Sequence, residues 1–210
     1  MSIATSLSES DLHMSGLRLF PGSRRPVPPE LIRACEEGLS YFPELVEVPI
    51  TFQWATMKRA TMAAQPRWYF WLRPRSERRY LIKVSNNLHL NHKINLREAP
   101  YRVLLGWVVH ELGHLMDYHR RSNRSLIGFI LGYLSSGRYR REAEYTADEF
   151  ALGRGLGEYL LETKQFLLGH SRLSDKYKAR LQRYYLPPEA VVAYLEAEEG
   201  PLLREDFWAD

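Results

Sequence analysis

Two histidines four residues apart, with a glutamate directly after the first, lie near the middle of the chain. They are His110, Glu111 and His114, in the stretch "GWVVHELGHLMDYH". On a helix, positions i and i+4 lie on one face, so both imidazoles can converge on one metal ion. Glu111 is rotated by about 100° from His110, which places it beside the metal without making it a ligand. The spacing therefore provides two zinc ligands and one base for the attacking water.

The residues around this motif repeat with helical spacing. The apolar positions of the repeat are Val103, Leu104, Trp107, Val108, Leu112 and Leu115. We therefore expect the motif to lie on a helix that begins near Pro100 and whose other face is buried. The alternative is an ordinary core helix whose histidines bond to backbone carbonyls. A third ligand would distinguish a zinc site from an ordinary core helix, because catalytic zinc usually takes three protein groups and one water.

Several sources of a third ligand can be compared. An extended H-E-x-x-H-x-x-G-x-x-H motif would need a histidine where Arg120 stands, and His119 falls one residue early. A cysteine-rich site is excluded because Cys35, expected to be a small core residue, is the single cysteine. A carboxylate on a later helix remains, and "EAEYTADEF" supplies Glu144.

Glu144 and Asp148 are four residues apart and share a helical face. We expect Glu144 to bind the metal and Asp148 to accept the free ring N–H of a ligand histidine, His110. Glu142 is a weaker candidate for the third ligand, because it is six residues from Asp148 and falls on another face of the helix. Glu149 has no carboxylate four residues further on.

The rest of the sequence indicates the elements that must position these groups. "PELIRACEEGLSYF" predicts a first helix, and "VEVPITFQWATM", "RWYFWL" and "RRYLIKVS" predict three strands, the last two adjacent. "RYRREAEYTADEFAL" predicts the second motif helix. Three more helices follow, one of them capped by Ser174. This order defines an α+β fold. We expect a flexible lead-in over 1–27, a domain over 28–157 and a helical C-terminal extension over 158–210 packed on it.

The composition agrees with a globular protein. The chain has 210 residues and a net charge of +4. It shows no signal segment, and its longest apolar runs are far shorter than the ~20 residues that span a bilayer. We therefore expect a soluble, cytoplasmic protein. The basic, aromatic stretch Lys58–Tyr80 could bind nucleic acid or an anionic membrane. The preferred interpretation is a strand with arginines on its solvent face.

The two motifs together resemble the gluzincin metallopeptidases, in particular the heat-shock membrane proteases and CAAX-prenyl endopeptidases. "VVHELGHLMDYH" is similar to their active-site helix, and "EYTADEFA" to their E-[YF]-x-A-D-x-[FY]-A run. The resemblance covers about Tyr80–Leu152. It implies a zincin-like fold with a small sheet on the active-site helix. It also implies one Zn²⁺ bound by His110, His114 and Glu144, with Glu111 as general base. Asp148 would then bond to a ligand histidine from the side away from the metal.

Members of that group carry transmembrane helices, whereas this chain has only "SLIGFILGYLSSG" between its motifs. We expect this segment to form a hairpin or short helix over the site, to be a truncated remnant, or to touch a membrane through 126–134. The chain thus resembles the small soluble minigluzincins. "ERRYLIKVSNNLHL" is similar to their strand at the rim of the cleft.

The activity that the resemblance implies is peptide-bond hydrolysis. An extended peptide would lie along an edge strand near Tyr80–Asn86, with Ser85 and Asn86 as binding residues. Nearby basic residues would favour acidic or polar substrates. The residues that could stabilise the oxyanion are His170, Tyr159 and Arg172, and the sequence prefers none of them.

Two other functions stay open. The chain could be a latent or inactive zinc-binding scaffold, inhibited by its acidic tail "EEGPLLREDFWAD". It could also bind nucleic acid through Arg67–Arg79, which we consider the weaker hypothesis and which predicts a strongly salt-dependent affinity.

Overall fold

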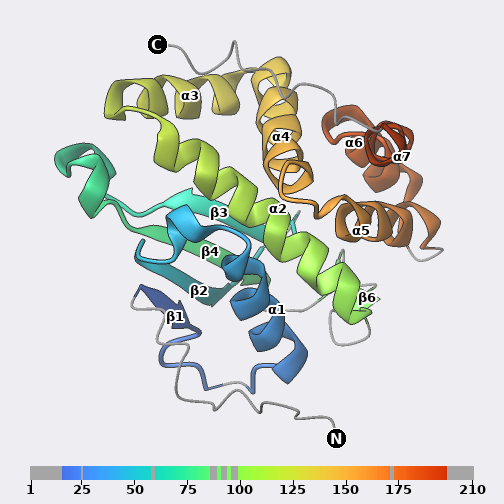
Figure 1. Cartoon of the computed structure of the whole chain (residues 1–210), viewed down its shortest axis with the longest axis horizontal. Helices are drawn as coiled ribbons and strands as arrows, with labels where there is room; N and C mark the ends of the chain where they lie inside the picture. Colours follow the sequence, from blue (N-terminus) through green and yellow to red (C-terminus); the bar gives the residue numbers. More distant parts are fainter. Residues whose placement is uncertain are drawn as a thin grey trace, which may run out of the picture.

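A computed structural model of the chain describes residues 16–24, 26–57, 60–85, 89–90, 94–95, 99–170 and 173–197. Within them the fold is α+β, as expected, and mostly helical, with a small mixed sheet of four strands and a separate pair of short strands. The long helix α2 (Tyr101–Arg120) runs diagonally through the molecule, with the sheet on one side and the later helices on the other (Figure 1).

The main sheet has four strands in the order β1-β2-β4-β3. Their bounds are β1 Leu17–Leu19, β2 Ile50–Ala55, β3 Met62–Pro66 and β4 Tyr80–Ser85. The first two pairs, β1 with β2 and β2 with β4, are parallel, whereas β3 is antiparallel to β4. The short strands β5 (His89–Leu90) and β6 (Ile94–Asn95) form a separate antiparallel pair. Because β3 is an edge strand, one of its sides is open to other groups.

The strand predictions are partly wrong. "RWYFWL" is not a strand, since Tyr69 has a φ of +69° and a 3-10 turn, η2 (Phe70–Leu72), follows it. A left-handed residue interrupts extended backbone. The antiparallel partner of β4 is instead the preceding segment, β3. Residues 17–19, within the expected lead-in, form β1.

The predicted helices are all present. Their bounds are α1 Pro29–Ser40, α4 Gly137–Leu152, α5 Gly157–Gly169, α6 Asp175–Tyr184 and α7 Pro188–Glu196. Ser174 caps α6 by accepting a hydrogen bond from the backbone N–H of Tyr177. The 3-10 turns η1 (Pro43–Leu45) and η3 (Arg75–Glu77) lie in loops.

The segment between the two motifs is a helix, α3 (Asn123–Ser135), and not a hairpin. It packs against α4 and the η2 turn. Within the described residues, no helix has both the length and the apolar character needed to cross a membrane.

The core lies where α1 and α2 cover the sheet, and Cys35 is buried in it as expected. Helix α2 is buried on all sides from Val103 to Tyr118. Its polar side chains, His110, Glu111, His114 and Asp117, are therefore buried as well. Because an unpaired buried polar group is costly, the partners of these side chains determine what the helix can do.

Candidate metal centre

Two glycines let neighbouring helices approach α2 at the level of its histidines. A Cβ on Gly113 would collide with the carbonyl oxygen of Ala147 on α4, and a Cβ on Gly106 would collide with Thr163 and Tyr159 on α5. Only glycine permits such close backbone contact. The side chains next to these contacts on α4 and α5 can therefore reach the histidines of α2.

Three buried side chains converge at the crossing of α2 and α4. His110 Nε2 lies 3.1 Å, and His114 Nε2 3.3 Å, from the same Oε2 of Glu144. One ligand atom from each residue lies within 4.8 Å of the others, so His110, His114 and Glu144 could hold a metal ion. Two imidazole nitrogens and one carboxylate oxygen are a donor set that suits a divalent transition metal.

The carboxylate of Asp148 lies behind His110. His110 Nδ1 is 2.9 Å from Asp148 Oδ1, which is the contact expected from the sequence. On its other side, Asp148 Oδ2 accepts a hydrogen bond of 2.6 Å from Nζ of Lys164 on α5. Lys164 is buried and was not anticipated, because it lies on another helix and no local spacing relates it to the motifs.

The protonation of the cluster follows from these contacts. Burial alone would lower the pKa of His110, but its bonds to Asp148 and Glu144 raise that pKa to about 10. For Glu144 the effects are reversed: burial alone would raise its pKa, but His114 and His110 hold that pKa well below its usual range. Among the described residues, the buried Nδ1 of His114 has no hydrogen-bond partner. A cation between these groups would replace the proton that His110 otherwise carries.

Glu111 faces the open edge of the sheet. Its Oε2 accepts a hydrogen bond of 2.6 Å from the backbone N–H of Ala64 in β3. Burial raises the pKa of this carboxyl, and the neighbouring His114 and His110 oppose the rise. Glu111 thus lies beside the three residues that could hold a metal ion without belonging to that group, as its position on the helix predicts.

Two tyrosines complete the centre. The hydroxyl of Tyr133, on α3, donates to Glu144 Oε1 at 3.3 Å. The ring of Tyr185, just after α6, lies 5.5 Å from the His110 ring. Neither was predicted, because each comes from a segment that only tertiary packing brings to α2.

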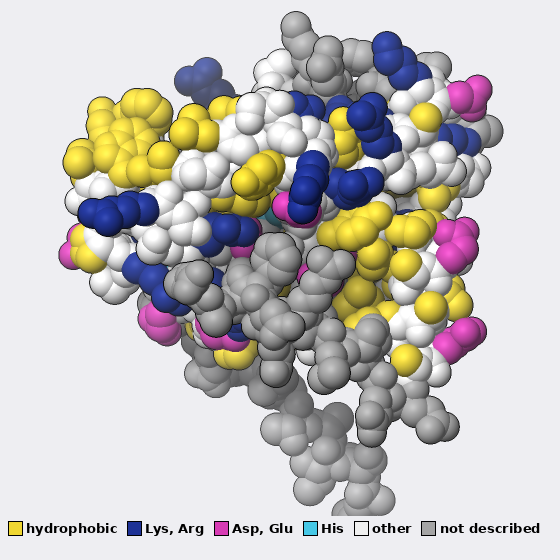
Figure 2. Space-filling view, turned by 90° about the horizontal axis from the view of Figure 1, so that it is seen from above, with side chains coloured by type: hydrophobic (Ala, Val, Ile, Leu, Met, Phe, Trp, Pro, Cys, Tyr) yellow, Lys and Arg dark blue, Asp and Glu magenta, His cyan; other side chains and the backbone are white. Residues whose placement is uncertain are grey.

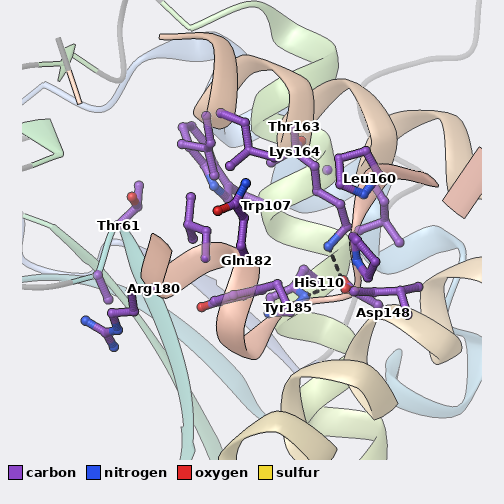
Figure 3. Close-up of a pocket in the computed structure, with 18 of the residues that line it drawn as sticks. Thr61, Trp107, His110, Asp148, Leu160, Thr163, Lys164, Arg180, Gln182 and Tyr185 are labelled. Carbon is purple, nitrogen blue, oxygen red and sulfur yellow. Dashed lines mark hydrogen bonds and ion pairs between the residues drawn. The ribbon is translucent and has the colours of Figure 1, made fainter. Parts of the chain in front are cut away.

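The cleft beside the centre encloses about 870 Å³, part of it open to solvent. His110, Glu111 and Asp148 line it together with apolar side chains that include Met62, Trp107, Leu160, Leu167, Leu181 and Leu186. Lys164, Asp148 and His110 meet at one end, and Tyr185 extends from there toward Thr61 and Arg180 (Figure 3). Because Lys164 is paired with Asp148, the inner wall offers little unpaired charge.

The other residues considered as ligands lie elsewhere. His119 Nδ1 is 3.3 Å from the hydroxyl of Tyr80, and Glu142 pairs with Arg138 at 2.8 Å. Neither belongs to the group that could hold a metal.

Two of the residues considered for the oxyanion, Tyr159 and His170, do not line the cleft. The Tyr159 ring lies under the guanidinium of Arg102, and His170 packs against Phe166. Arg172 lies outside the described residues.

The expected substrate strand needs correction. β4 lies between β2 and β3, so it has no open edge, and the edge nearest the centre belongs to β3. Ser85 is buried, and its backbone N–H donates to Thr61 at 2.9 Å. Asn86 lies outside the described residues. A role for either in substrate binding stays a prediction.

No protein-family model, curated protein or solved structure matches this chain. The function of this chain must therefore be inferred from its own residues.

Proposed function

We propose that this chain is a zinc-dependent peptidase of the zincin-like type, in which His110, His114 and Glu144 hold one Zn²⁺ and Glu111 is the general base. The observation that carries the proposal is the convergence of three buried candidate ligands, two histidines and Glu144, with a second carboxylate, Glu111, beside them. When bound, zinc would acidify the attacking water and polarise the scissile carbonyl.

The residues behind the ligands would orient them. Asp148 accepts from His110 Nδ1 and thereby turns Nε2 toward Glu144 and the metal position. Such contacts fix the tautomer and the ring plane of a ligand histidine. Tyr133 holds the second oxygen of Glu144 in the same way.

Glu111 would carry the proton. It would accept a proton from the attacking water and deliver it to the leaving amine nitrogen. The burial that raises its pKa makes it a better proton acceptor at neutral pH than an exposed glutamate. The bond from Ala64 holds one of its oxygens at the edge of β3.

The substrate would be an extended peptide added to β3, because an open edge can bond to peptide backbone. Such a peptide would compete for the Ala64 N–H and so release Glu111 toward the water. The apolar wall of the cleft favours an apolar substrate side chain over the acidic or polar one expected from the sequence. Tyr185, and not His170 or Tyr159, lines this cleft and is the better candidate to stabilise the oxyanion.

A latent or inactive form of the same centre is the second candidate. All four central side chains are less than 9% exposed, and Glu111 is bonded to Ala64. Both features fit a site that is closed to substrate until something opens it.

The first experiment is the zinc content of the purified protein, followed by cleavage of a mixed peptide library. We expect one zinc per chain, lost in Glu144→Ala but retained in Glu142→Ala, whose side chain lies on the same helix and pairs with Arg138. Glu111→Gln should keep zinc and lose cleavage. Absence of zinc from the intact protein would refute the proposal. Stoichiometric zinc with no cleavage would favour the latent form.

A further inference from the structure

A group of apolar side chains on the outer surface is not used by the metal centre. Trp68, Leu72, Leu131 and Leu134 expose 71%, 72%, 62% and 69% of their surface. On the face seen from above, hydrophobic side chains form separate groups, one of them at the upper left edge, with Lys and Arg side chains beside and between the groups (Figure 2). We call the following residues the apolar patch: Trp68, Tyr69, Trp71, Leu72, Ile127, Leu131 and Leu134. Soluble proteins rarely leave so many large apolar side chains uncovered without a binding partner.

The first part of the patch is the loop after β3. Phe70 is buried and anchors the loop, while the left-handed turn at Tyr69 directs its neighbours outward. The ring of Trp68 contacts those of Trp71 and Tyr69, with centroids 4.9 and 5.5 Å apart. The exposed aromatic side chains therefore form one projecting cluster.

The second part is the outer face of α3. Ile127, Leu131 and Leu134 are spaced by four and three residues, so they share one face of the helix, and all three are exposed. Leu126 and Phe129 point the other way, into the core. α3 thus has an apolar face on both sides, and only the inner one is covered within the described structure.

The loop and α3 are held together as one surface. The side-chain amide of Asn123 donates to the carbonyls of Trp71 and Arg73 at 3.3 and 3.0 Å. The buried guanidinium of Arg78 bonds to Asn123 and donates to the carbonyl of Tyr118 at 2.8 Å. These contacts fix the position of the projecting aromatic rings relative to the helix.

The charged side chains around the patch are mostly basic. Between residues 119 and 141 the sequence has six arginines and no acid, although Arg120, Arg121 and Arg138 pair with acids outside this range. Between 67 and 79 the one acid, Glu77, pairs with Arg73. Arg75, Arg79 and Arg124 are exposed and make no ion pair within the described residues. A projecting apolar cluster with a basic surround is complementary to an anionic lipid surface.

We infer that the apolar patch docks on an anionic membrane. Trp68, Tyr69 and Leu72 enter the interface, where amphipathic aromatic rings are favoured, and the arginines contact lipid phosphates. Side chains that stand out from the surface suit a fluid interface better than a shaped protein pocket. Because Tyr133 of α3 donates to Glu144, docking holds the metal centre close to the membrane. The inference does not depend on peptidase activity.

The test is co-sedimentation of the full chain with vesicles. We expect binding to phosphatidylcholine vesicles that contain about 30% phosphatidylserine, and at least tenfold weaker binding to pure phosphatidylcholine. About 0.5 M NaCl should reduce binding, because salt screens the arginines.

Two double variants separate the apolar and basic contributions. Trp68→Ala with Leu72→Ala should weaken vesicle binding about tenfold or more, since it removes the apolar side chains that insert. Arg75→Glu with Arg79→Glu should weaken it similarly. The matched control is Arg18→Glu with Arg24→Glu, the same charge change near β1, which lies far from α3 (Figure 1). Circular dichroism and urea denaturation verify that each variant is folded.

Three outcomes would overturn the inference. The first is that the chain does not bind anionic vesicles. The second is that Trp68→Ala with Leu72→Ala leaves vesicle binding unchanged. The third is that the Arg18 and Arg24 control weakens vesicle binding as much as the Arg75 and Arg79 variant does. Sedimentation velocity without lipid tests whether the patch instead binds a second copy of the chain. Self-association that the Trp68 and Leu72 variant abolishes would assign the patch to a second copy of the chain.

Discussion

The ammonium group of Lys164 on α5 lies 2.6 Å from Oδ2 of Asp148 on α4. Asp148 in turn contacts His110 on α2, so three helices meet in one chain of polar contacts. The segment after residue 157, expected to pack on the domain as an extension, therefore contributes to the metal centre. A buried carboxylate with a cation on one side and an imidazole on the other has little freedom to rotate.

Lys164→Met should therefore weaken zinc binding by about 10–100-fold, because Asp148 would lose the partner that holds it against His110. The measurement is competition for zinc with a chromophoric chelator. In the Co²⁺-loaded protein, the visible spectrum should change as well, which a purely structural role would not produce. Gln165→Met, at the exposed neighbouring position on α5, is the control. Equal zinc affinity in Lys164→Met and the control would contradict the positioning role.

The metal-free protein should lose stability as pH rises. The folded-state pKa of His110 is raised from 6.5 to about 10, so its stabilising contribution is complete below pH 6.5 and is lost as pH rises toward 10. Urea unfolding with a chelator should show a loss on the order of 2 kcal/mol between about pH 6.5 and pH 9. The His110→Asn variant should not show this loss of stability between about pH 6.5 and pH 9. An identical pH dependence in both proteins would refute it.

Acid should weaken the same cluster for the opposite reason. The pKa values of Glu144 and Asp148 are lowered, so their contributions are present above their usual pKa values, 4.5 and 3.8, and are lost as pH falls below them. Asp148→Asn should flatten the acid side of the stability curve. A curve that is as steep as that of the unsubstituted protein would contradict the assignment.

Gly113→Ala should force α2 and α4 apart at the metal centre. Its Cβ would collide with the Ala147 carbonyl, which is rigid backbone, so we expect a loss of about 2–3 kcal/mol in the free energy of unfolding and weaker zinc binding. Gly128→Ala on α3 is the matched control, because nothing lies within 4 Å of its added Cβ. That change should stabilise the protein by about 0.5–1 kcal/mol. Urea denaturation measures both, and effects of the same sign would contradict the close crossing.

Leu181→Glu should alter the substrate preference of the proposed peptidase. It places a carboxylate on the apolar wall of the cleft, so kcat/KM for peptides with leucine or phenylalanine at the cleaved bond should fall about 10–100-fold. For peptides with lysine at the cleaved bond, kcat/KM should fall less or should rise. Ala179→Glu, exposed on the same helix, should stay within about twofold of the unsubstituted protein. Parallel losses for every peptide would argue against a side-chain pocket.

The exposed loop shows where local patterns mislead. "RWYFWL" has the composition of a strand but lacks alternation, because its large side chains are consecutive. With Tyr69 in a left-handed conformation, one aromatic ring is buried and the others project into solvent. The basic and aromatic composition of this stretch was visible in the sequence, but the exposure of its rings was not.

The sequence by itself determined the groups whose relation is local. His110, Glu111 and His114 are set by the turn of one helix, and Glu144 with Asp148 by the turn of another, so spacing alone indicated which atoms share a face. Their convergence, the Lys164 contact, the two tyrosines and the open edge at β3 were decided by tertiary structure. Each of these joins segments far apart in the chain, and the close approach at Gly106 and Gly113, which no periodicity encodes, brings α5 and α4 to α2.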